Sequence, residues 1–344
     1  MSAEANQLKR LSRSPSSKPA SSFIEADSHD SGNEEDGLSL TSSMYNFPME
    51  NGRRYHRYRE GAYVYPNDEP ELERLNLQHF ILQQAFGGRS YFAPLRNPKR
   101  MLDIGTGTGV WPLEMAEEFP DCEIIGTDLS PIQPQMVAEN VHFFIDDAAE
   151  EDWLYPPNHF DYIHTRAMAG SFEDFRHIIR QAFFYLKPGA WLESQEIMSK
   201  VYCDDGTMPD TWPFVTWSRD LDDAAIRNDR PIRIANKLKR WYEEAGFVDV
   251  HEEVFKVAAN PWPKDEHMKR LGRLSMRNIL EGLQGLSMAT FHRALGWTKE
   301  EVEVYLVEVR KALQDRSVHA YHKIFVVWGR KPEDVVSQPR PKPS

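Results

Sequence analysis

Residues 101–110, MLDIGTGTGV, join a short apolar segment to three glycines with an acid just ahead of them. Gly105, Gly107 and Gly109 follow a G-x-G-x-G spacing, whereas the dinucleotide fingerprint G-x-G-x-x-G needs its third glycine one position later. Asp103 lies at the expected carboxyl end of the strand that leads into this loop. Because a glycine cluster alone is weak evidence, this acid has to help decide which ligand the loop holds.

The acid separates two candidate ligands by charge. NAD carries a pyrophosphate, which prefers backbone N–H groups at a helix N-terminus and is repelled by a nearby carboxylate. S-adenosylmethionine has no phosphate and carries two positive groups, a sulfonium and an ammonium. Asp103 therefore favours S-adenosylmethionine, and it argues against an NAD-dependent oxidoreductase.

Acids also follow the next two expected strands. Asp128 ends EIIGTD and can accept both hydroxyls of a ribose, as in sites for either ligand, while Asp146 and Asp147 follow VHFFI, within reach of an adenine amino group. Ligands of open α/β sheets bind at the carboxyl ends of strands, so we expect these acids to meet at one site. The residues predicted to bind the cofactor are Asp103, Gly105, Thr106, Gly107, Gly109, Asp128, Leu129, Asp146, Asp147 and Ala148.

Three further side chains are candidates for catalysis. His164 ends FDYIHT and is predicted to face the reacting methyl group, as a general base for a protonated substrate, although a structural histidine is the alternative. Arg166 could anchor a substrate carboxylate, or it could pair with Asp161 or Asp147. Glu196, at the end of a fifth expected strand, is the third candidate.

Apolar strands alternate with helical patterns from residue 100 onward. KRMLDI, EIIGTD, VHFFID, FDYIHT and AWLESQEI are predicted strands, and VWPLEMAEEF and SFEDFRHIIRQAFFYL are predicted helices. This alternation predicts a parallel sheet with helices on both faces. After residue 200 helical patterns dominate, including one that begins at Thr298 with a capping box. FVDVHEEVFKVA is a predicted strand among them, and HAYHKIFVVWGRK is the last predicted strand.

Composition narrows the class of protein. The 344 residues include 53 acids and 41 Lys or Arg, a net charge of −12, which argues against direct nucleic-acid binding. The two cysteines provide neither a disulfide framework nor a thiolate metal site, so no metal is expected. No secretory or membrane-spanning pattern is visible, which favours the cytoplasm, the nucleus or both. LKRLSRSPSSKP, near the N-terminus, is a nuclear-import or phosphorylation segment or a plain solvated tail.

DIGTGTG, GTDLS and FFIDDA resemble the first three motifs of the class I S-adenosylmethionine-dependent methyltransferases. NGRRYHRYREGAYVYPNDEPELERL, GTDLSPIQP, LKPGAWLESQEI, NPWP and HAYHKIFVVWGRKP narrow the resemblance to the LaeA-like methyltransferases of filamentous fungi, over about residues 50–332. The resemblance implies a Rossmann-like α/β fold with a seven-stranded, mostly parallel sheet whose last strand is antiparallel. It also implies a role in secondary metabolism.

Two roles follow from that resemblance. One is a tailoring enzyme that methylates an oxygen or nitrogen of a small-molecule metabolite. The other is a nuclear regulator that acts through protein partners with little small-molecule activity. The acidic tail is shorter than expected of the regulator itself, which favours a paralogue.

The chain is expected to divide into a methyltransferase domain and its additions. These are a disordered tail (1–45), an N-terminal helical cap (46–98), the methyltransferase domain (99–332) with helical insertions at about 205–245 and 264–316, and a frayed end (333–344). We expect the cap, around Tyr55 to Tyr65, and the helical segments after residue 205 to roof the substrate pocket, because methyl transfer needs water kept from the reacting centre.

Overall fold

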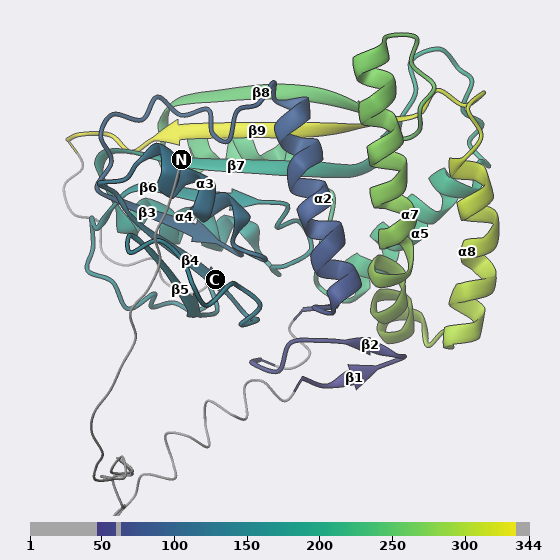
Figure 1. The fold of residues 1–344 in the computed structure, drawn as a ribbon, viewed down its shortest axis with the longest axis horizontal. Coiled ribbons are helices and arrows are strands. Elements are labelled where there is room, and N and C mark those ends of the chain that lie inside the picture. Colours follow the sequence, from purple (N-terminus) through teal and green to yellow (C-terminus); the bar gives the residue numbers. More distant parts are fainter. Residues whose placement is uncertain (1–46, 60–62, 335–344) are drawn as a thin grey trace, which may run out of the picture. The chain divides into compact units, whose positions relative to one another are not determined.

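A seven-stranded sheet forms the centre of the fold, with its strands in the order β5-β4-β3-β6-β7-β9-β8 (Figure 1). The strands are β3 (Arg100–Ile104), β4 (Glu123–Asp128), β5 (Val141–Ile145), β6 (Phe160–Arg166), β7 (Leu186–Tyr202), β8 (Val248–Ala258) and β9 (Tyr321–Arg330). Neighbours from β5 to β7 pair in parallel, and β9 is antiparallel to both β7 and β8. The predicted sheet, with its antiparallel last strand, is confirmed.

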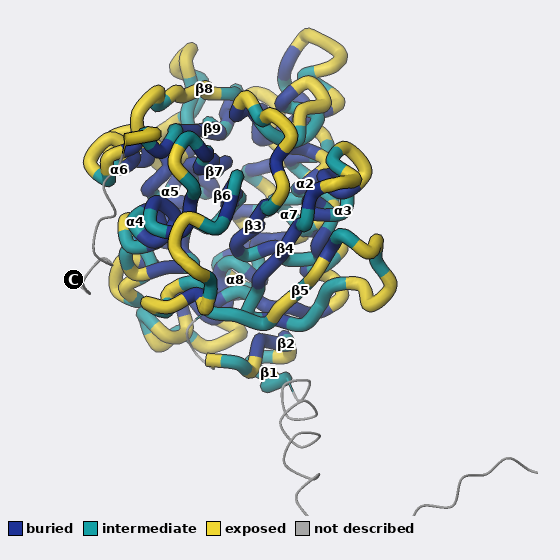
Figure 2. Tube along the Cα trace, turned by 90° about the vertical axis from the view of Figure 1, so that its left-hand side faces the viewer, coloured by how far each residue is buried: buried dark blue, intermediate teal, exposed yellow. Residues whose placement is uncertain are grey.

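The central strands are apolar on both faces because both faces are covered. Met101 and Tyr162 pack in one apolar cluster with Trp111, whereas their neighbours Leu102 and Ile163 pack in another. Successive side chains of a strand point to opposite faces, so this division places one cluster on each side of the sheet. In Figure 2 the tube of β3, β6 and β7 is accordingly dark blue over much of its length, with exposed segments around it.

The helices divide between the sheet and a layer of their own. They are α2 (Glu69–Ala85), α3 (Val110–Glu118), α4 (Phe175–Tyr185), α5 (Pro213–Arg227), the 3₁₀ turn η1 (Ala235–Lys237), α6 (Leu238–Ala245), α7 (Glu266–Leu295) and α8 (Lys299–Leu313). α4 and α6 pack together on one face of the sheet, and α2 and α3 lie on the other. α5, α7 and α8 share one apolar cluster and stand side by side in Figure 1. The capping box at Thr298 is present.

The strand order places a switch point beside β3. The chain goes from β3 to β4 and β5 on one side, then returns to place β6 on the other side of β3. The loops after β3 and β6 therefore diverge, and they leave a crevice at the carboxyl ends of these strands, where open α/β sheets bind their ligands.

The segment before α2 is held by a largely buried ion pair. It contains a short hairpin of β1 (Met49–Glu50) and β2 (Arg53–Arg54). The Arg53 guanidinium donates to both carboxylate oxygens of Asp68, at 2.6 and 2.8 Å. Asp68 is also the N-cap of α2 and accepts from the Glu71 backbone N–H. The same carboxylate therefore starts the helix and ties the hairpin to it.

The structure describes residues 47–59 and 63–334, which belong to one compact unit. The helical cap expected over 46–98 contains β1, β2 and α2, and α2 packs against α7. The insertion expected at about 205–245 contributes to two layers of the fold. Its first helix, α5, packs with α7 and α8, whereas α6 packs on the sheet. The tail expected at 1–45, with LKRLSRSPSSKP, and the frayed end from 335 onward lie outside the described residues.

Replacing Asp68 by Ala should lower the free energy of unfolding by about 3 kcal/mol, because it removes a helix cap and strands the Arg53 charge in a largely buried position. Urea unfolding of the full chain measures this loss. Glu69→Ala is the matched control, since Glu69 is the next residue and pairs with Arg54 at the surface. That variant should unfold almost as the parent does, and equal losses in the two variants would contradict the role given to Asp68.

Candidate active site

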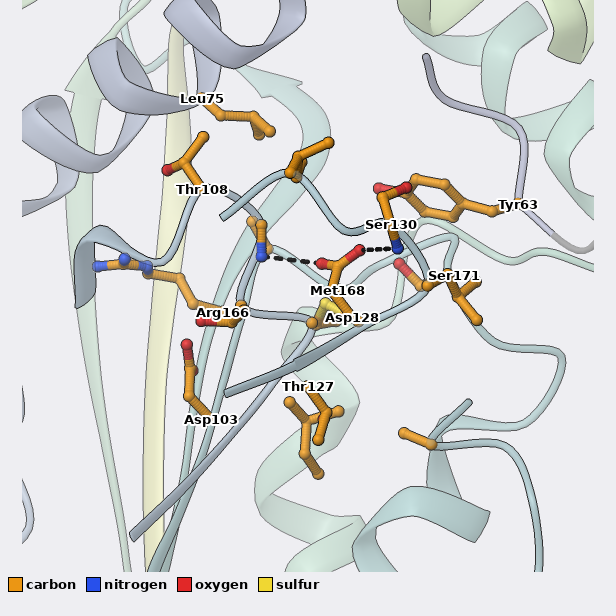
Figure 3. A pocket seen from close by; sticks show the side chains of 18 of the residues that line it. Tyr63, Leu75, Asp103, Thr108, Thr127, Asp128, Ser130, Arg166, Met168 and Ser171 are labelled. Carbon is orange, nitrogen blue, oxygen red and sulfur yellow. Dashed lines mark hydrogen bonds between the residues drawn. The ribbon is translucent and has the colours of Figure 1, made fainter. Parts of the chain in front are cut away.

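A cavity lies at the carboxyl ends of β3, β4 and β6, and we call it the strand-end cavity (Figure 3). The loops after these strands and after β5 form its floor, and α2 with the segment before it forms the opposite wall. The structure thus brings most residues of the predicted site together. Those that line the cavity are Asp103, Gly105, Thr106, Gly107, Asp128, Leu129, Asp146, Asp147, Ala148 and Arg166.

The N–H groups of the glycine loop are used within the protein. The Thr106 N–H donates to the Thr127 carbonyl at 2.9 Å, and the Gly107 N–H donates to the Asp128 carboxylate at 2.8 Å. The Gly109 N–H donates to the Thr106 carbonyl at 3.0 Å. A dinucleotide site needs such N–H groups for its pyrophosphate. These three donors are therefore engaged within the protein and are not free to bind a phosphate.

Two positions of the loop require glycine for different reasons. Gly105 has a φ of +67°, and a Cβ there would lie 2.2 Å from the Met168 sulfur. Gly107 has a φ of +57°, and the nearest atom to its Cβ would be Leu75 Cδ1 at 3.8 Å. Leu75 also lines the cavity, so a methyl group on Gly107 would enter the space between them. Gly105 is therefore needed for packing and Gly107 for ligand access.

Gly109 does not line the cavity, although the sequence predicts it among the ligand-binding residues. It is the left-handed N-cap of α3, with a φ of +78°. A Cβ at this position would lie 2.5 Å from Cζ of Phe143, a residue of β5. Its glycine is explained by the tight turn into α3 and by this contact.

Asp103 is held by His164 rather than lying free at the strand end. His164 Nδ1 and Asp103 Oδ1 are 2.7 Å apart, and the imidazole is fully buried. Trp111, which lines the cavity, stacks on the imidazole with ring centroids 4.0 Å apart and planes 6° apart. His164 itself does not line the cavity. The expectation that it faces the reacting methyl group therefore differs from the structure, which supports the structural alternative.

Asp128 joins the ends of β3 and β4. One carboxylate oxygen accepts the Gly107 N–H, and the other accepts the Ser130 N–H at 2.9 Å (Figure 3). Burial raises the pKa of Asp128 to about 6, although these backbone hydrogen bonds oppose the rise. In Figure 3, Asp128 and Ser130 lie on one side of the cavity, and Asp103 and Arg166 lie on the other. The cavity therefore has a carboxylate toward each end.

Arg166 forms a hydrogen bond with a histidine of α2 and not with either of the two acids that the sequence suggested as partners. Its guanidinium donates to His79 Nδ1 at 2.8 Å, and His79 Nε2 contacts Glu114 at 2.8 Å. Asp161 and Asp147, the two partners considered for it, pair with other cations. Burial lowers the pKa of Arg166. A guanidinium thus lines the cavity near Asp103 while its hydrogen-bonded partner is an imidazole.

The acids after β5 lie at the same cavity. Burial raises the pKa of Asp146. Asp147 accepts the Ala149 N–H at 2.9 Å and lies 3.8 Å from the Arg59 guanidinium. Both acids therefore belong to the cavity wall, and Asp147 also connects that wall to the segment before α2.

A second cavity adjoins the first, and we call it the helix-side cavity. α2, α5, α7 and β7 supply most of its wall. Six residues line both cavities: Tyr63, Glu71, Leu75, Gln78, Leu82 and Ala167. Glu196 lines this second cavity rather than the first, beside Phe214 and Trp217 of α5. The two cavities share walls, so ligands in them would lie next to each other.

Several lining residues were missing from the site predicted from sequence. Tyr63, Asn67 and Leu75 come from the cap, and the Asn67 side-chain amide donates to the Ser130 hydroxyl at 3.1 Å. The mixed Arg and Tyr residues of NGRRYHRYREGAYVYPND were the available signal, since they suggested a cover for the pocket. Nothing local to this segment shows which of its side chains face the strands, because that depends on how the hairpin and α2 dock.

Two further features describe the surroundings of the site. Within residues 47–59 and 63–334, no group of three or more His, Cys, Asp or Glu side chains is placed to hold a metal ion. In the same ranges, none of the helices is long and apolar enough to cross a membrane.

Comparison with known proteins gives the family. The family described as a methyltransferase domain matches residues 77–252. The chain is 39% identical over 296 residues to methyltransferase pytC of Aspergillus terreus, covering 86% of this chain and 91% of that protein. It is 36% identical over 303 residues to the secondary metabolism regulator LAE1 of Cochliobolus heterostrophus (86% and 98% covered). Identity is 32% over 296 residues to the protein-methionine methyltransferase laeA of Emericella nidulans (86% and 79% covered).

The family match covers more than half of the chain, and the relatives match over most of their own lengths. The sheet order, the crevice beside β3 and the carboxylates at both ends of the strand-end cavity agree with this match. The chain therefore belongs to the LaeA-like methyltransferases, which are enzymes that use S-adenosylmethionine as their cofactor.

Proposed function

We propose that the strand-end cavity holds S-adenosylmethionine and that the helix-side cavity holds a small molecule of fungal secondary metabolism, which receives the methyl group. The observation that carries the second part is the adjoining cavity itself. Its walls come mainly from α2, α5, α7 and β7, and neither α5 nor α7 lines the strand-end cavity. A concave, largely apolar space of this kind suits a small molecule.

The residues of the strand-end cavity fit the chemical groups of the cofactor. Asp128 is suited to the ribose hydroxyls, Asp103 to the ammonium group, and Asp146 with Ala148 to the adenine. The hydroxyls of Thr106 and Ser171 are buried without a hydrogen-bond partner among the described residues, and both residues line the cavity.

The cofactor supplies an electrophilic methyl group, and the chain supplies alignment and a dry environment. Orientation of the two reacting molecules is worth about 7 to 11 kcal/mol in favourable cases. Tyr63 and Leu75 line both cavities and so lie where the donor and the acceptor would meet. Arg166 adds a positive charge on the Asp103 side of the cavity, where a carboxylate of either molecule could be held.

A second candidate function is regulation through protein partners. Two of the relatives favour it, because one is named a regulator of secondary metabolism and another a protein-methionine methyltransferase. In this function the methyl acceptor is a protein side chain, and the helix-side cavity receives that side chain.

Labelled methyl transfer separates the two functions. Incubating the full chain with methyl-tritiated S-adenosylmethionine and a small-molecule extract of the producing fungus should label at least one metabolite, because the proposed acceptor is a small molecule. A parallel incubation with the protein fraction tests the alternative. Label confined to protein would refute the tailoring function and favour the regulator.

Binding of S-adenosylhomocysteine should weaken in acid because Asp128 must be ionised to accept the ribose hydroxyls. Burial raises its pKa to about 6, so affinity should be constant above that pH and fall as the pH drops through it. Below the step the loss approaches about tenfold per pH unit. Calorimetry between pH 8 and pH 5 measures it.

Asp128→Asn should bind about ten- to a hundredfold more weakly, since a hydrogen bond to a charged group is worth about 1.5 to 3 kcal/mol. It should also show no step near pH 6. Asp174→Asn is the control, because Asp174 caps α4 away from the cavity. An unchanged step in folded Asp128→Asn protein would remove Asp128 from the ribose position.

Gly107→Ala should cost at least about tenfold in cofactor affinity, because its methyl group enters the cavity, and about 1 to 2 kcal/mol in stability, because of its left-handed backbone. Gly206→Ala separates these effects. Gly206 has a φ of +75°, nothing lies within 4 Å of its Cβ position, and it lines neither cavity. This control should lose comparable stability and bind S-adenosylhomocysteine normally. If Gly107→Ala also binds normally, the cofactor does not approach this part of the loop.

A further inference from the structure

We propose that the helix-side cavity accepts an uncharged, flat and largely apolar molecule whose hydroxyl group transfers its proton to Glu196. The inference rests on the proposed function, because the methyl donor has to occupy the adjoining strand-end cavity. It goes further by naming the chemical class of the acceptor and the group that takes its proton.

Glu196 lies at the boundary between the two cavities. Its side chain is fully buried on β7 and lines the helix-side cavity. Its two carboxylate oxygens accept the N–H groups of Met168 and Ala169, at 2.9 and 3.0 Å. Ala167, which directly precedes Met168 in the chain, lines both cavities. The carboxyl group is therefore held in a fixed orientation next to the place where the two cavities meet.

The charges of the helix-side cavity exclude an anionic ligand. Glu71 and Arg74 line it from α2, but the Arg74 guanidinium donates to both Glu71 oxygens, at 2.9 and 2.6 Å, so these two charges neutralise each other. Glu196 has no Lys, Arg or His within 4.0 Å in the part of the chain that the structure describes. The cavity thus offers one carboxylate and no unpaired cation, and a negatively charged ligand would be repelled.

The remaining wall favours a flat apolar body. Phe214 and Trp217 lie with ring centroids 5.4 Å apart and planes 15° apart, and Tyr65 contributes a ring from the cap. Leu221 of α5 and Ile279 of α7 extend this apolar surface. Aromatic rings bury large areas and stack on flat molecules. An aromatic or polyene ring system with few polar groups fits this wall better than a sugar or a peptide.

A positively charged amine is the main alternative, since it could pair with an ionised Glu196. The geometry favours a hydroxyl, which donates a single proton, over an ammonium with three, because the Glu196 carboxylate already accepts two backbone N–H groups. Burial also raises the pKa of Glu196 to about 7, so that the group gains and loses a proton near neutral pH instead of keeping a permanent charge. Such a group suits general-base catalysis.

The proposed step conserves atoms and charge. A lone pair of the acceptor oxygen forms the new O–C bond, the C–S⁺ bond breaks with its electron pair kept by sulfur, and the hydroxyl proton passes to the Glu196 carboxylate. The products are a methyl ether, a neutral thioether and a protonated Glu196, which returns its proton to water after the ether leaves.

The other titratable groups around Glu196 do not change charge near pH 7 in a way that would mimic it. Burial raises the pKa of Tyr65 to about 12 and those of Tyr63, also in the cap, and Tyr242 on α6 further still. Burial lowers the pKa of His322 on β9, which keeps its imidazole neutral at pH 7. The Glu71 carboxylate on α2 is bound to Arg74. The lining residues of α5 and α7 are not titratable.

The ligand class is tested by binding to the full chain saturated with S-adenosylhomocysteine. The probes are 2-naphthol, 2-naphthoate and 2-naphthylmethylamine, which share one flat body and carry a hydroxyl, a negative and a positive group. Calorimetry at pH 7.5 should show 2-naphthol binding at least about tenfold more tightly than 2-naphthoate, because burying an unpaired negative charge is costly. It should also bind more tightly than 2-naphthylmethylamine, because an ammonium has three donors and the Glu196 carboxylate already accepts two N–H groups. Tighter binding of either charged probe would overturn the proposal.

The location is tested by filling the cavity. Ile279→Trp adds bulk to the α7 wall of the helix-side cavity, which the strand-end cavity does not share. It should weaken 2-naphthol binding at least tenfold and leave the affinity for S-adenosylhomocysteine unchanged. Unchanged 2-naphthol binding would place the acceptor elsewhere.

The proton acceptor is tested by transfer from methyl-tritiated S-adenosylmethionine to 2-naphthol. The rate should rise with pH and level off above about 7, because Glu196 must be ionised to take the proton. Glu196→Gln should lose about a hundredfold or more in rate, together with this pH dependence, while 2-naphthol binding changes little. If Glu196→Gln keeps the rate and the pH profile, Glu196 is not the base.

Glu193→Gln is the matched control. Glu193 is a fully buried carboxylate on the same strand, and it accepts the N–H groups of Phe92 and Ala93 at 2.8 Å, but it lines neither cavity. The Glu193→Gln variant measures the loss of stability that follows when a buried carboxylate on β7 is replaced by an amide. The pH profile of its transfer rate should match that of the parent. Should Glu196→Gln fail to fold, the probe comparison with the parent chain still decides the ligand class.

The binding data distinguish a failure of the proposed function from a failure of the inference about the acceptor. A parent chain that does not bind S-adenosylhomocysteine contradicts the proposed function. A parent chain that binds S-adenosylhomocysteine normally but none of the three probes contradicts the inference about the acceptor alone.

Discussion

The site depends first on how one carboxylate is held between two loops. Asp128 accepts the N–H of Gly107 from the loop after β3 and the N–H of Ser130 from its own loop. The Ser130 hydroxyl in turn accepts from Asn67, which fastens the cap above the strand ends. The same hydrogen bond removes the Gly107 N–H from phosphate binding. The Asp128 carboxylate thus joins the two loops, and the Ser130 hydroxyl connects them to the cap.

The two cavities differ in the helices that line them. The strand-end cavity lies where the loops after β3 and β6 diverge at the switch point, and α2 with the segment before it forms its opposite wall. The helix-side cavity needs the cap, α5 and α7, whose apolar cluster is separate from those on the sheet faces. The sheet and the cap therefore contribute to both cavities, whereas α5 and α7 line the helix-side cavity alone.

The buried carboxylates around the two cavities are of two kinds. Some have a cation or an imidazole beside them, as with Glu71 beside Arg74 or Asp103 beside His164. Where a carboxylate has only backbone N–H partners, as at Asp128 and Glu196, burial raises its pKa toward neutrality. The second kind of group costs free energy to ionise in the absence of a ligand. Such groups are expected where a ligand completes the hydrogen bonding.

The sequence by itself determined the order of strands and helices along the chain, the two-sided sheet and the acids at the strand ends. These follow from the local periodicity of apolar residues and from the residues that directly follow or end each predicted strand. The sequence could not decide what faces the cavities. Gly109 does not line the strand-end cavity, and Phe143 of β5 fills the space beside it. Trp111 of α3 stacks on His164, which does not line this cavity either. Glu196 borders a second cavity only because α5 and α7 close over β7. These outcomes depend on packing between segments far apart in the chain, which local pattern does not encode.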